Sequence, residues 1–113
     1  NAVITSNTIR RNRAEGSYSE SDGGGVLCTA SASITGNTIR SNVAYDTGGG
    51  ICATGSASIV DNLITGNTAR YAGGVHLAAG VTRDNDIESN TSSYEGGGAR
   101  ITGSGTFSNN IVA

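Results

Sequence analysis

The 113-residue sequence has no proline, methionine, tryptophan or lysine, and it has a single phenylalanine. Large side chains normally fill the core of a globular domain of this length, so their scarcity argues against a compact globule. The same sequence has 18 glycines and four tyrosines. A thin repeat structure fits this composition better, because each repeat then buries only a few small apolar residues against its neighbours.

The missing lysines leave arginine as the only strong base, and the net charge is −2. Nucleic-acid-binding domains usually carry a basic excess, so nucleic acid is not expected as a partner. No apolar run approaches the roughly 20 residues of a membrane span. Because residue 1 is not methionine, we expect a chain processed from a secreted precursor, extracellular or on the cell surface, or a segment of a larger surface protein.

What the sequence does contain is a repeat. An asparagine, an isoleucine two residues later and a second asparagine three residues further on recur along the chain, and a glycine run follows each of the first four copies. The first asparagine of the block recurs at steps of 30, 25, 23 and 25 residues. A period near 25 is typical of stacked solenoids. The two asparagine columns are Asn37, Asn62, Asn85 and Asn110, with Asn7 before them, and Asn12, Asn42, Asn67 and Asn90.

Apolar residues form further columns when the copies are aligned. Those that follow the glycines alternate with a mostly polar column, which predicts half-buried strands with one outward face. The inward columns are Val26, Ile51, Val75 and Ala99; Cys28, Ala53, Leu77 and Ile101; Ile34, Ile59 and Phe107, with Ile4 before them and Thr82 as the weak member; and Ile9, Ile39, Ile64, Ile87 and Val112. The expected outward column is Leu27, Cys52, His76 and Arg100.

Three short strands per period of about 25 residues predict a right-handed parallel β-helix of about four coils. We expect a single all-β domain over residues 1–113, with an extra loop at 13–22 where the first copy is longer. Asparagine suits the sharp corners because it tolerates left-handed backbone, and stacked amides bond one another. We therefore interpret both asparagine columns as structural ladders rather than sugar-binding sites.

The motif Ile39-x-x-Asn42-x-Ala44, followed by three glycines and Ile51, recurs as Ile64-x-x-Asn67-x-Ala69 before Gly73. It resembles the FxxN and GGAI repeats of the chlamydial polymorphic outer-membrane proteins, although isoleucine mostly replaces phenylalanine. The resemblance implies a surface-exposed passenger or adhesin-type region.

Candidate chemistry is sparse. Asp61 and Asp84 share a column one coil apart and are the only repeated carboxylate pair, so a polysaccharide-degrading enzyme is kept as an alternative. Cys52 and His76 should be neighbours, but no third group orients the imidazole. We expect no catalytic residues, no cofactor and no metal. A disulfide between Cys28 and Cys52 is disfavoured because the two side chains should point to opposite faces.

Two surfaces remain as interaction candidates. Tyr18, Tyr45, Tyr71 and Tyr94 are expected at equivalent corners, where an aromatic stripe suits sugar stacking or subunit contact, and a polysaccharide or host-surface ligand is the expected partner. The ends carry no capping helix, so end-to-end self-association into a filament is also expected. The residues expected at the stacking ends are Ile4, Ile9, Phe107, Ile111 and Val112. Asn90 also lies in a glycosylation sequon.

Overall fold

A computed structural model describes residues 2–17 and 21–113, and in this part of the chain there are strands but no helix. The described residues thus include no helix of the length and apolar character needed to cross a membrane. The strands are β1 (Ala2–Thr5), β2 (Thr8–Arg10), β3 (Arg13–Ala14), β4 (Val26–Cys28), β5 (Ala32–Thr35), β6 (Thr38–Arg40), β7 (Val43–Ala44), β8 (Ile51–Val60), β9 (Leu63–Thr65), β10 (Thr68–Tyr71), β11 (Val75–Arg83), β12 (Asp86–Glu88), β13 (Thr91–Glu95), β14 (Ala99–Ile101), β15 (Thr106–Ser108) and β16 (Ile111–Val112).

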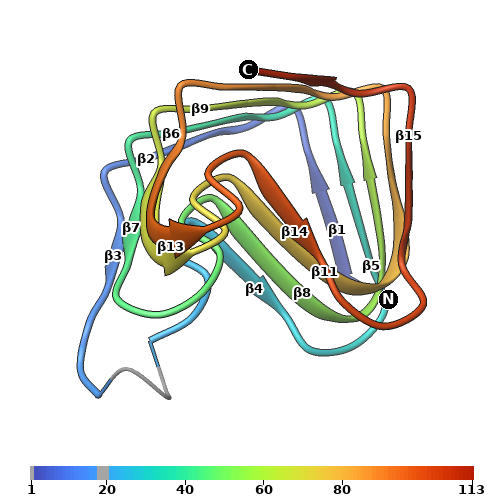
Figure 1. Ribbon diagram of the computed structural model, residues 1–113. Coiled ribbons are helices and arrows are strands. Elements are labelled where there is room, and N and C mark those ends of the chain that lie inside the picture. The colour runs from blue at the N-terminus through green and yellow to red at the C-terminus, as the bar shows by residue number, and fades with distance from the viewer. Residues whose placement is uncertain (1, 18–20) are drawn as a thin grey trace.

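The strands form three parallel sheets wound around one axis (Figure 1). Sheet 1 has seven strands in the order β1-β5-β8-β11-β14, with β4 beside β8 and β15 beside β11. Sheet 2 has the order β16-β12-β9-β6-β2, and sheet 3 has the order β13-β10-β7-β3. In Figure 1 the chain rises through β1, crosses through β2 and descends through β3 while it advances toward the viewer, so the coils are right-handed. The predicted fold class is confirmed.

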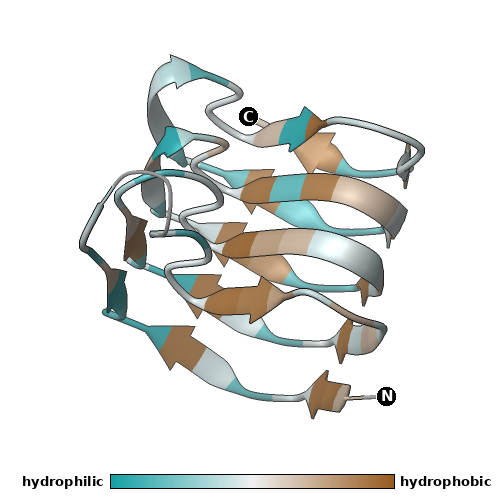
Figure 2. Cartoon of the chain, turned by 90° about the horizontal axis from the view of Figure 1, so that it is seen from below, coloured by the Kyte–Doolittle hydropathy of each residue, from teal (hydrophilic) through white to brown (hydrophobic). Residues whose placement is uncertain are grey.

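The coil count differs slightly from the expected four. Three coils contain both halves of sheet 1 together with sheets 2 and 3, and they begin at β4, β8 and β11. A partial coil, β1 to β3, precedes them, and another, β14 to β16, follows them. Figure 2 shows these levels stacked, with the two termini at opposite ends of the solenoid.

The core runs along the axis and is built from the predicted inward columns, except at the last level, where Ile101 and Val112 are exposed. Ile51, Ile64 and Ile87 are each 0 % exposed, and they belong to one apolar cluster with Val26, Val75 and Ile39. The β-helix therefore needs no large aromatic core, because each level buries the apolar residues of the level below it.

Sheet 3 is the element that the column analysis missed. Its inward positions are Ala14, Ala44, Ala69 and Ser92, which are too small and too few per strand to give an apolar alternation. The signal was nevertheless present as the small residue two positions after the second asparagine of the motif. β3 takes up Arg13 and Ala14, the first two residues of the segment expected as a loop, and residues 18–20 of that segment lie outside the described residues.

The corners differ in detail from the expectation. The left-handed residue is the one before each ladder asparagine: Asp61 has φ 57° before Asn62, and Ser41 has φ 57° before Asn42. The preceding residue makes the bend, and the asparagine then directs its amide along the axis. Glycine occupies the same position at Gly36 and Gly66, where positive φ costs least.

Candidate functional site

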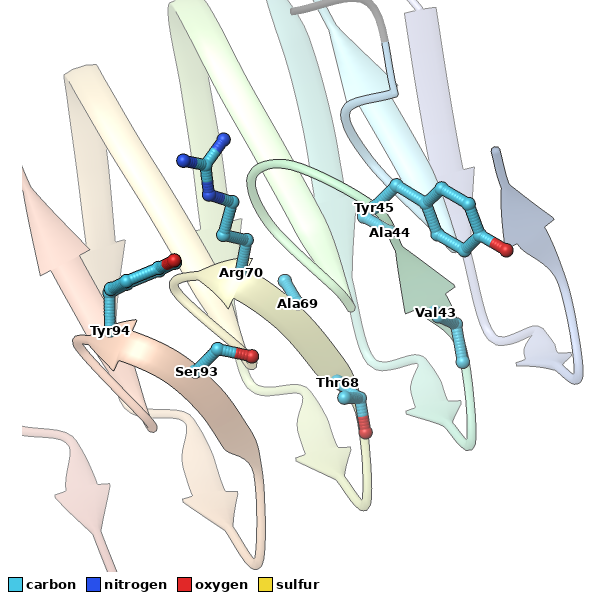
Figure 3. Close-up of a pocket in the computed structure, with 8 residues that line it drawn as sticks. All are labelled: Val43, Ala44, Tyr45, Thr68, Ala69, Arg70, Ser93 and Tyr94. Atoms are coloured by element: carbon cyan, nitrogen blue, oxygen red, sulfur yellow. The ribbon is translucent and has the colours of Figure 1, made fainter. Parts of the chain in front are cut away.

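A groove lies on the outer face of sheet 3 and has a volume of about 330 Å³ (Figure 3). Three successive coils line it, through β7, β10, β13 and the residues beside them. The lining residues are Val43, Ala44, Tyr45, Thr68, Ala69, Arg70, Ser93 and Tyr94. In Figure 3 the side chains of Tyr45 and Tyr94 project at opposite ends of this face, with Arg70 on the strand between them.

A β-bulge sets the geometry at one end of the groove. Thr68 pairs with Thr91 and Ala69 with Ser92, but Tyr71 pairs with Glu95, so Ser93 and Tyr94 together lie opposite a single residue, Arg70. A bulge adds one residue to a strand and re-aims the side chains beside it. In this chain the bulge places the Tyr94 ring against the Tyr71 ring of the neighbouring coil.

The aromatic rings and guanidinium groups at this end form one cluster. The rings of Tyr71 and Tyr94 are stacked, with centroids 5.4 Å apart and an interplanar angle of 25°. Arg70 Cζ lies 5.3 Å from the Tyr71 centroid and 5.1 Å from the Tyr94 centroid, and Arg100 Cζ lies 5.2 Å from the Tyr71 centroid. These distances are within the range of cation–π attraction. Tyr94 is nevertheless 66 % exposed, so much of its surface faces solvent.

The other end of the groove is built around Tyr45. Arg13 Cζ lies 5.6 Å from the Tyr45 ring centroid, and its Nη2 donates to the Tyr45 hydroxyl at 3.5 Å. The Arg13 Nε donates to Glu15 at 2.8 Å. The hydrogen bonds to Tyr45 and Glu15 raise the pKa of Arg13, so it carries its positive charge.

Each of the three arginines that lie next to these tyrosines has a carboxylate partner. Arg13 pairs with Glu15 at 2.8 Å, Arg70 approaches Asp46 at 3.9 Å, and Arg100 pairs with Glu95 at 2.9 Å. The face is therefore polar and rich in hydrogen-bonding groups, yet its positive and negative charges are balanced.

The expected tyrosine stripe is only partly assembled. Tyr18 lies outside the described residues. Tyr71 bridges to Thr47 rather than to Tyr45, so Tyr45 and Tyr71 do not occupy the same register position. Tyr71 and Tyr94 come into contact because of the bulge, which the sequence repeat does not reveal. The three arginines were not singled out from the sequence, although Arg70 directly precedes Tyr71.

The two asparagine columns form continuous hydrogen-bonded ladders inside the corners. Asn67 Oδ1 accepts from both the backbone N and the Nδ2 of Asn42, at 3.0 Å each. Asn67 Nδ2 donates to Asn90 Oδ1 at 3.0 Å and to the Ile39 carbonyl at 2.9 Å. Asn42 and Asn67 are fully buried, whereas Asn90 is half-buried and Asn12 is exposed at the first level. The same pattern joins the column from Asn7 to Asn110. These buried amides are engaged with one another and with backbone, and they are not presented to a ligand.

The burial of Cys52 was not expected, because its column was predicted to face outward. Cys52 lies on the side of β8 away from the core, but it is only 1 % exposed. The turn before β8 covers it, since a Cβ built on Gly48 would lie 2.7 Å from the Cys52 Cβ. Cys52 Sγ is 3.7 Å from His76 Nδ1, and His76 Nε2 is 2.9 Å from Thr102 Oγ1. Cys28 is buried in the core, and both cysteines are free.

In the expected carboxylate pair, Asp84 is engaged by neighbouring side chains. Asp84 is held by Arg83 at 2.6 Å and by the Asn109 amide, and the Asn109 hydrogen bond followed by Arg83 lowers the pKa of Asp84. A hollow next to Asp84 is lined by Asn85, Asp86, Asn109 and Ile111, without Asp61. In the described part of the chain, no three His, Cys, Asp or Glu side chains gather in a way that could hold a metal ion.

Comparison with known proteins gives one assignment. No curated protein and no solved structure matches the chain. The chlamydial likeness therefore stays a prediction, while the broader expectation of a parallel β-helix repeat protein is confirmed by the fold. The family model described as "Periplasmic copper-binding protein (NosD)" matches residues 1–113, and the chain belongs to this family.

Proposed function

We propose that the protein is a non-catalytic scaffold of the cell envelope that binds a polysaccharide or host-surface ligand on the outer face of sheet 3. The family description supports a location in the envelope, outside the cytoplasm. One observation carries the proposal: a groove across three coils ends in a stacked, largely exposed tyrosine beside Arg70. Exposed aromatic rings with polar neighbours are a common basis of ligand binding by rigid scaffolds.

The pKa of Asp84 and the position of Asp61 favour an adhesive scaffold over an enzyme. A glycosidase needs a general acid whose pKa is raised, with a second carboxylate facing it. The Asp84 carboxylate has the opposite property, because Asn109 and Arg83 lower its pKa. Its column neighbour Asp61 lies outside the hollow that Asp84 lines.

Copper, which the family description names, does not fit the donor set of this chain. Copper sites use imidazole and soft sulfur donors, and the sequence has one histidine, two cysteines and no methionine. Cys28 lies in the core, so only Cys52 and His76 converge, at 3.7 Å. Burial, reinforced by Asp22 and Asp46, raises the pKa of the Cys52 thiol to about 12, which disfavours the thiolate that a metal requires. The proposed function does not depend on copper.

The proposal is tested by affinity electrophoresis of the purified protein in gels that contain soluble cell-wall or plant polysaccharides. We expect at least one polysaccharide to retard the wild type, and Tyr94→Ala to lose the retardation because it removes the exposed ring. Arg40→Ala, on sheet 2, is the control and should be retarded as much as the wild type is, each relative to its own mobility in a gel without polysaccharide. Equal retardation of wild type and Tyr94→Ala in every gel would contradict binding at this groove.

A second candidate role is end-to-end association with another copy. At the last level Ile111 is 68 % exposed and Val112 is 47 % exposed, whereas Ile87, one coil below Val112, is fully buried. Val3 at the first level is 69 % exposed. A further coil placed on the last level would bury Val112 as Ile87 is buried one coil below, and on either level it would continue the parallel strand pairing.

Sedimentation velocity at increasing protein concentration tests this second role. We expect larger species at high concentration, and their loss in Val112→Lys, because Val112 belongs to the inward column above Ile87 and the charge would then be buried at the joint. Thr65→Lys adds the same charge to the outer side of sheet 2 and should leave association unchanged. A single monomeric species for the wild type at all concentrations would refute self-association.

A further inference from the structure

The groove on sheet 3 has a direction and a repeat. Its lining comes from the same part of three successive coils, in which Val43 pairs with Thr68 and Thr68 pairs with Thr91. Neighbouring parallel strands are about 4.8 Å apart, so the coils recur at that interval along the axis, while the outward side chain changes from Tyr45 to Arg70 and then to Ser93 and Tyr94. Figure 3 shows the successive strands crossing the groove side by side. A linear ligand that lies along the axis would thus meet one coil per step.

The charge pattern limits the ligand. Arg13, Arg70 and Arg100 each face a carboxylate, at 2.8, 3.9 and 2.9 Å respectively. A polyanion would have to displace these carboxylates or face them directly, and the net charge of −2 would oppose its approach. A neutral ligand avoids both costs, and it can accept hydrogen bonds from guanidinium groups that remain paired.

The strand pattern argues against a peptide. An extended peptide binds a sheet by adding a strand to a free edge. Beneath the groove, β10 is paired on both sides, with β7 and β13, and β7 is also paired with β3. Across β7 and β10 the groove therefore offers side chains and ring faces rather than a free backbone edge, and of the strands that line it β13 alone lies at the end of the sheet in the described part of the chain.

We propose that this groove binds a neutral, linear glycan whose pyranose chain lies parallel to the solenoid axis, with about one sugar unit per coil. The inference rests on the proposed function, because it names the ligand of the same groove. A β-1,4-linked pyranose chain advances by nearly the spacing of the coils, so each successive sugar lies over the next coil. The apolar face of the terminal sugar stacks on Tyr94, while the hydroxyls of Thr68 and Ser93 and the Arg70 guanidinium bond the sugar hydroxyls.

The test is isothermal titration calorimetry with β-1,4-linked glucose oligomers, from the disaccharide to the hexasaccharide, and with oligogalacturonides of the same lengths. We expect the affinity for glucose oligomers to rise up to the trisaccharide and then to level off, because three coils line the groove. We expect Tyr94→Ala to weaken the binding about tenfold, in line with the loss of one aromatic contact. Arg40→Ala, on sheet 2, leaves the groove intact and should bind as the wild type does.

The possible failures are distinguishable. Tighter binding of oligogalacturonides that still depends on Tyr94 would overturn the neutral ligand but keep the groove as the binding site. Affinity that does not change with oligomer length would overturn the axial orientation. Tyr94-dependent binding of single-stranded polynucleotide in place of glycan would overturn the ligand class. Binding of every polysaccharide without dependence on Tyr94 would overturn the proposed function as well.

Discussion

At the scale of single residues, the ladder asparagines explain how so small a core is held together. Each buried asparagine fills one level with an amide that bonds the next level, its backbone and a neighbouring carbonyl, so no polar atom of the corner amide has to reach water. Asn67 has no exposed surface. Removing one asparagine therefore leaves its buried partners without a hydrogen bond, which costs more than the loss of a surface hydrogen bond.

We expect Asn67→Ala to lower the free energy of unfolding by about 1–3 kcal/mol, because Asn42 and the Ile39 carbonyl each lose a partner. Urea unfolding followed by circular dichroism measures the change. The matched control is Asn12→Ala, at the exposed first level of the same ladder, which should cost less than about 0.5 kcal/mol. Equal effects of the two substitutions would show that the ladder does not depend on burial.

The two thiols should be inert in the folded protein. Burial raises the pKa of Cys28, and burial followed by Asp22 and Asp46 raises the pKa of Cys52 to about 12. Both thiols therefore remain protonated up to well above neutral pH, and the reactive thiolate is scarce. With a chromogenic disulfide reagent at pH 8 we expect no fast reaction in the native state and two thiols after unfolding without reductant. A count of zero after unfolding would mean that the two cysteines are bridged.

At the scale of elements, the binding face depends on one irregularity in a regular ladder. β13 has one residue more than β10 between paired positions, and the extra residue brings Tyr94 to Tyr71. The glycines before β4, β8 and β11 act in the opposite sense, because they hold successive coils at the same close spacing. A Cβ at Gly24, Gly49 or Gly73 would lie 2.4 Å from a backbone oxygen, which cannot move aside as a flexible side chain can.

Gly50→Ala should be strongly destabilising. The added Cβ would lie 2.7 Å from the Gly74 carbonyl oxygen and 3.0 Å from Ile64 Cγ2, so neighbouring backbone has to move. We expect a cost of about 1–3 kcal/mol in urea unfolding, as for other overpacked sites. Gly97→Ala is the control, since its Cβ would come no closer than 3.4 Å to the Asn90 carbonyl. A loss as large for Gly97→Ala would mean that backbone entropy rather than crowding explains both.

At the scale of the whole molecule, the protein is a short one-dimensional stack, in which each coil contacts mainly the coils before and after it. Stability of such arrays is a sum over coils and their interfaces. The middle coils have two interfaces, whereas the partial coils at the ends have one. Val112 is accordingly 47 % exposed, while Ile64 and Ile87 of the same column are fully buried.

Hydrogen exchange measured by mass spectrometry should follow this gradient. We expect the slowest exchange in β8, β9 and β10, because their amides are covered on both sides, and the fastest in β1, β2 and β16. The Val112→Lys protein provides the control, since it should speed exchange in β16 without affecting β8. Uniform protection along the chain would indicate that all coils open together as one cooperative unit.

The sequence by itself determined the coil. The period near 25, the isoleucine columns and the asparagine pairs are strictly local and repeat at every level, so they specify a right-handed parallel β-helix with these residues inside. The sequence could not show which corner residue bends, because Asp61, Ser41 and Gly66 share the left-handed position without sharing a residue type. Nor did it show sheet 3, whose inward residues are too small to give an apolar signal.

Only the tertiary structure decided the candidate site. The contact between Tyr71 and Tyr94 arises from a shift in register between two coils, and Arg70 is brought to Asp46 from the neighbouring coil. The burial of Cys52 likewise depends on a turn that folds over the outer side of sheet 1. A repeat fixes what every coil has in common, whereas a binding site depends on how one coil departs from the next.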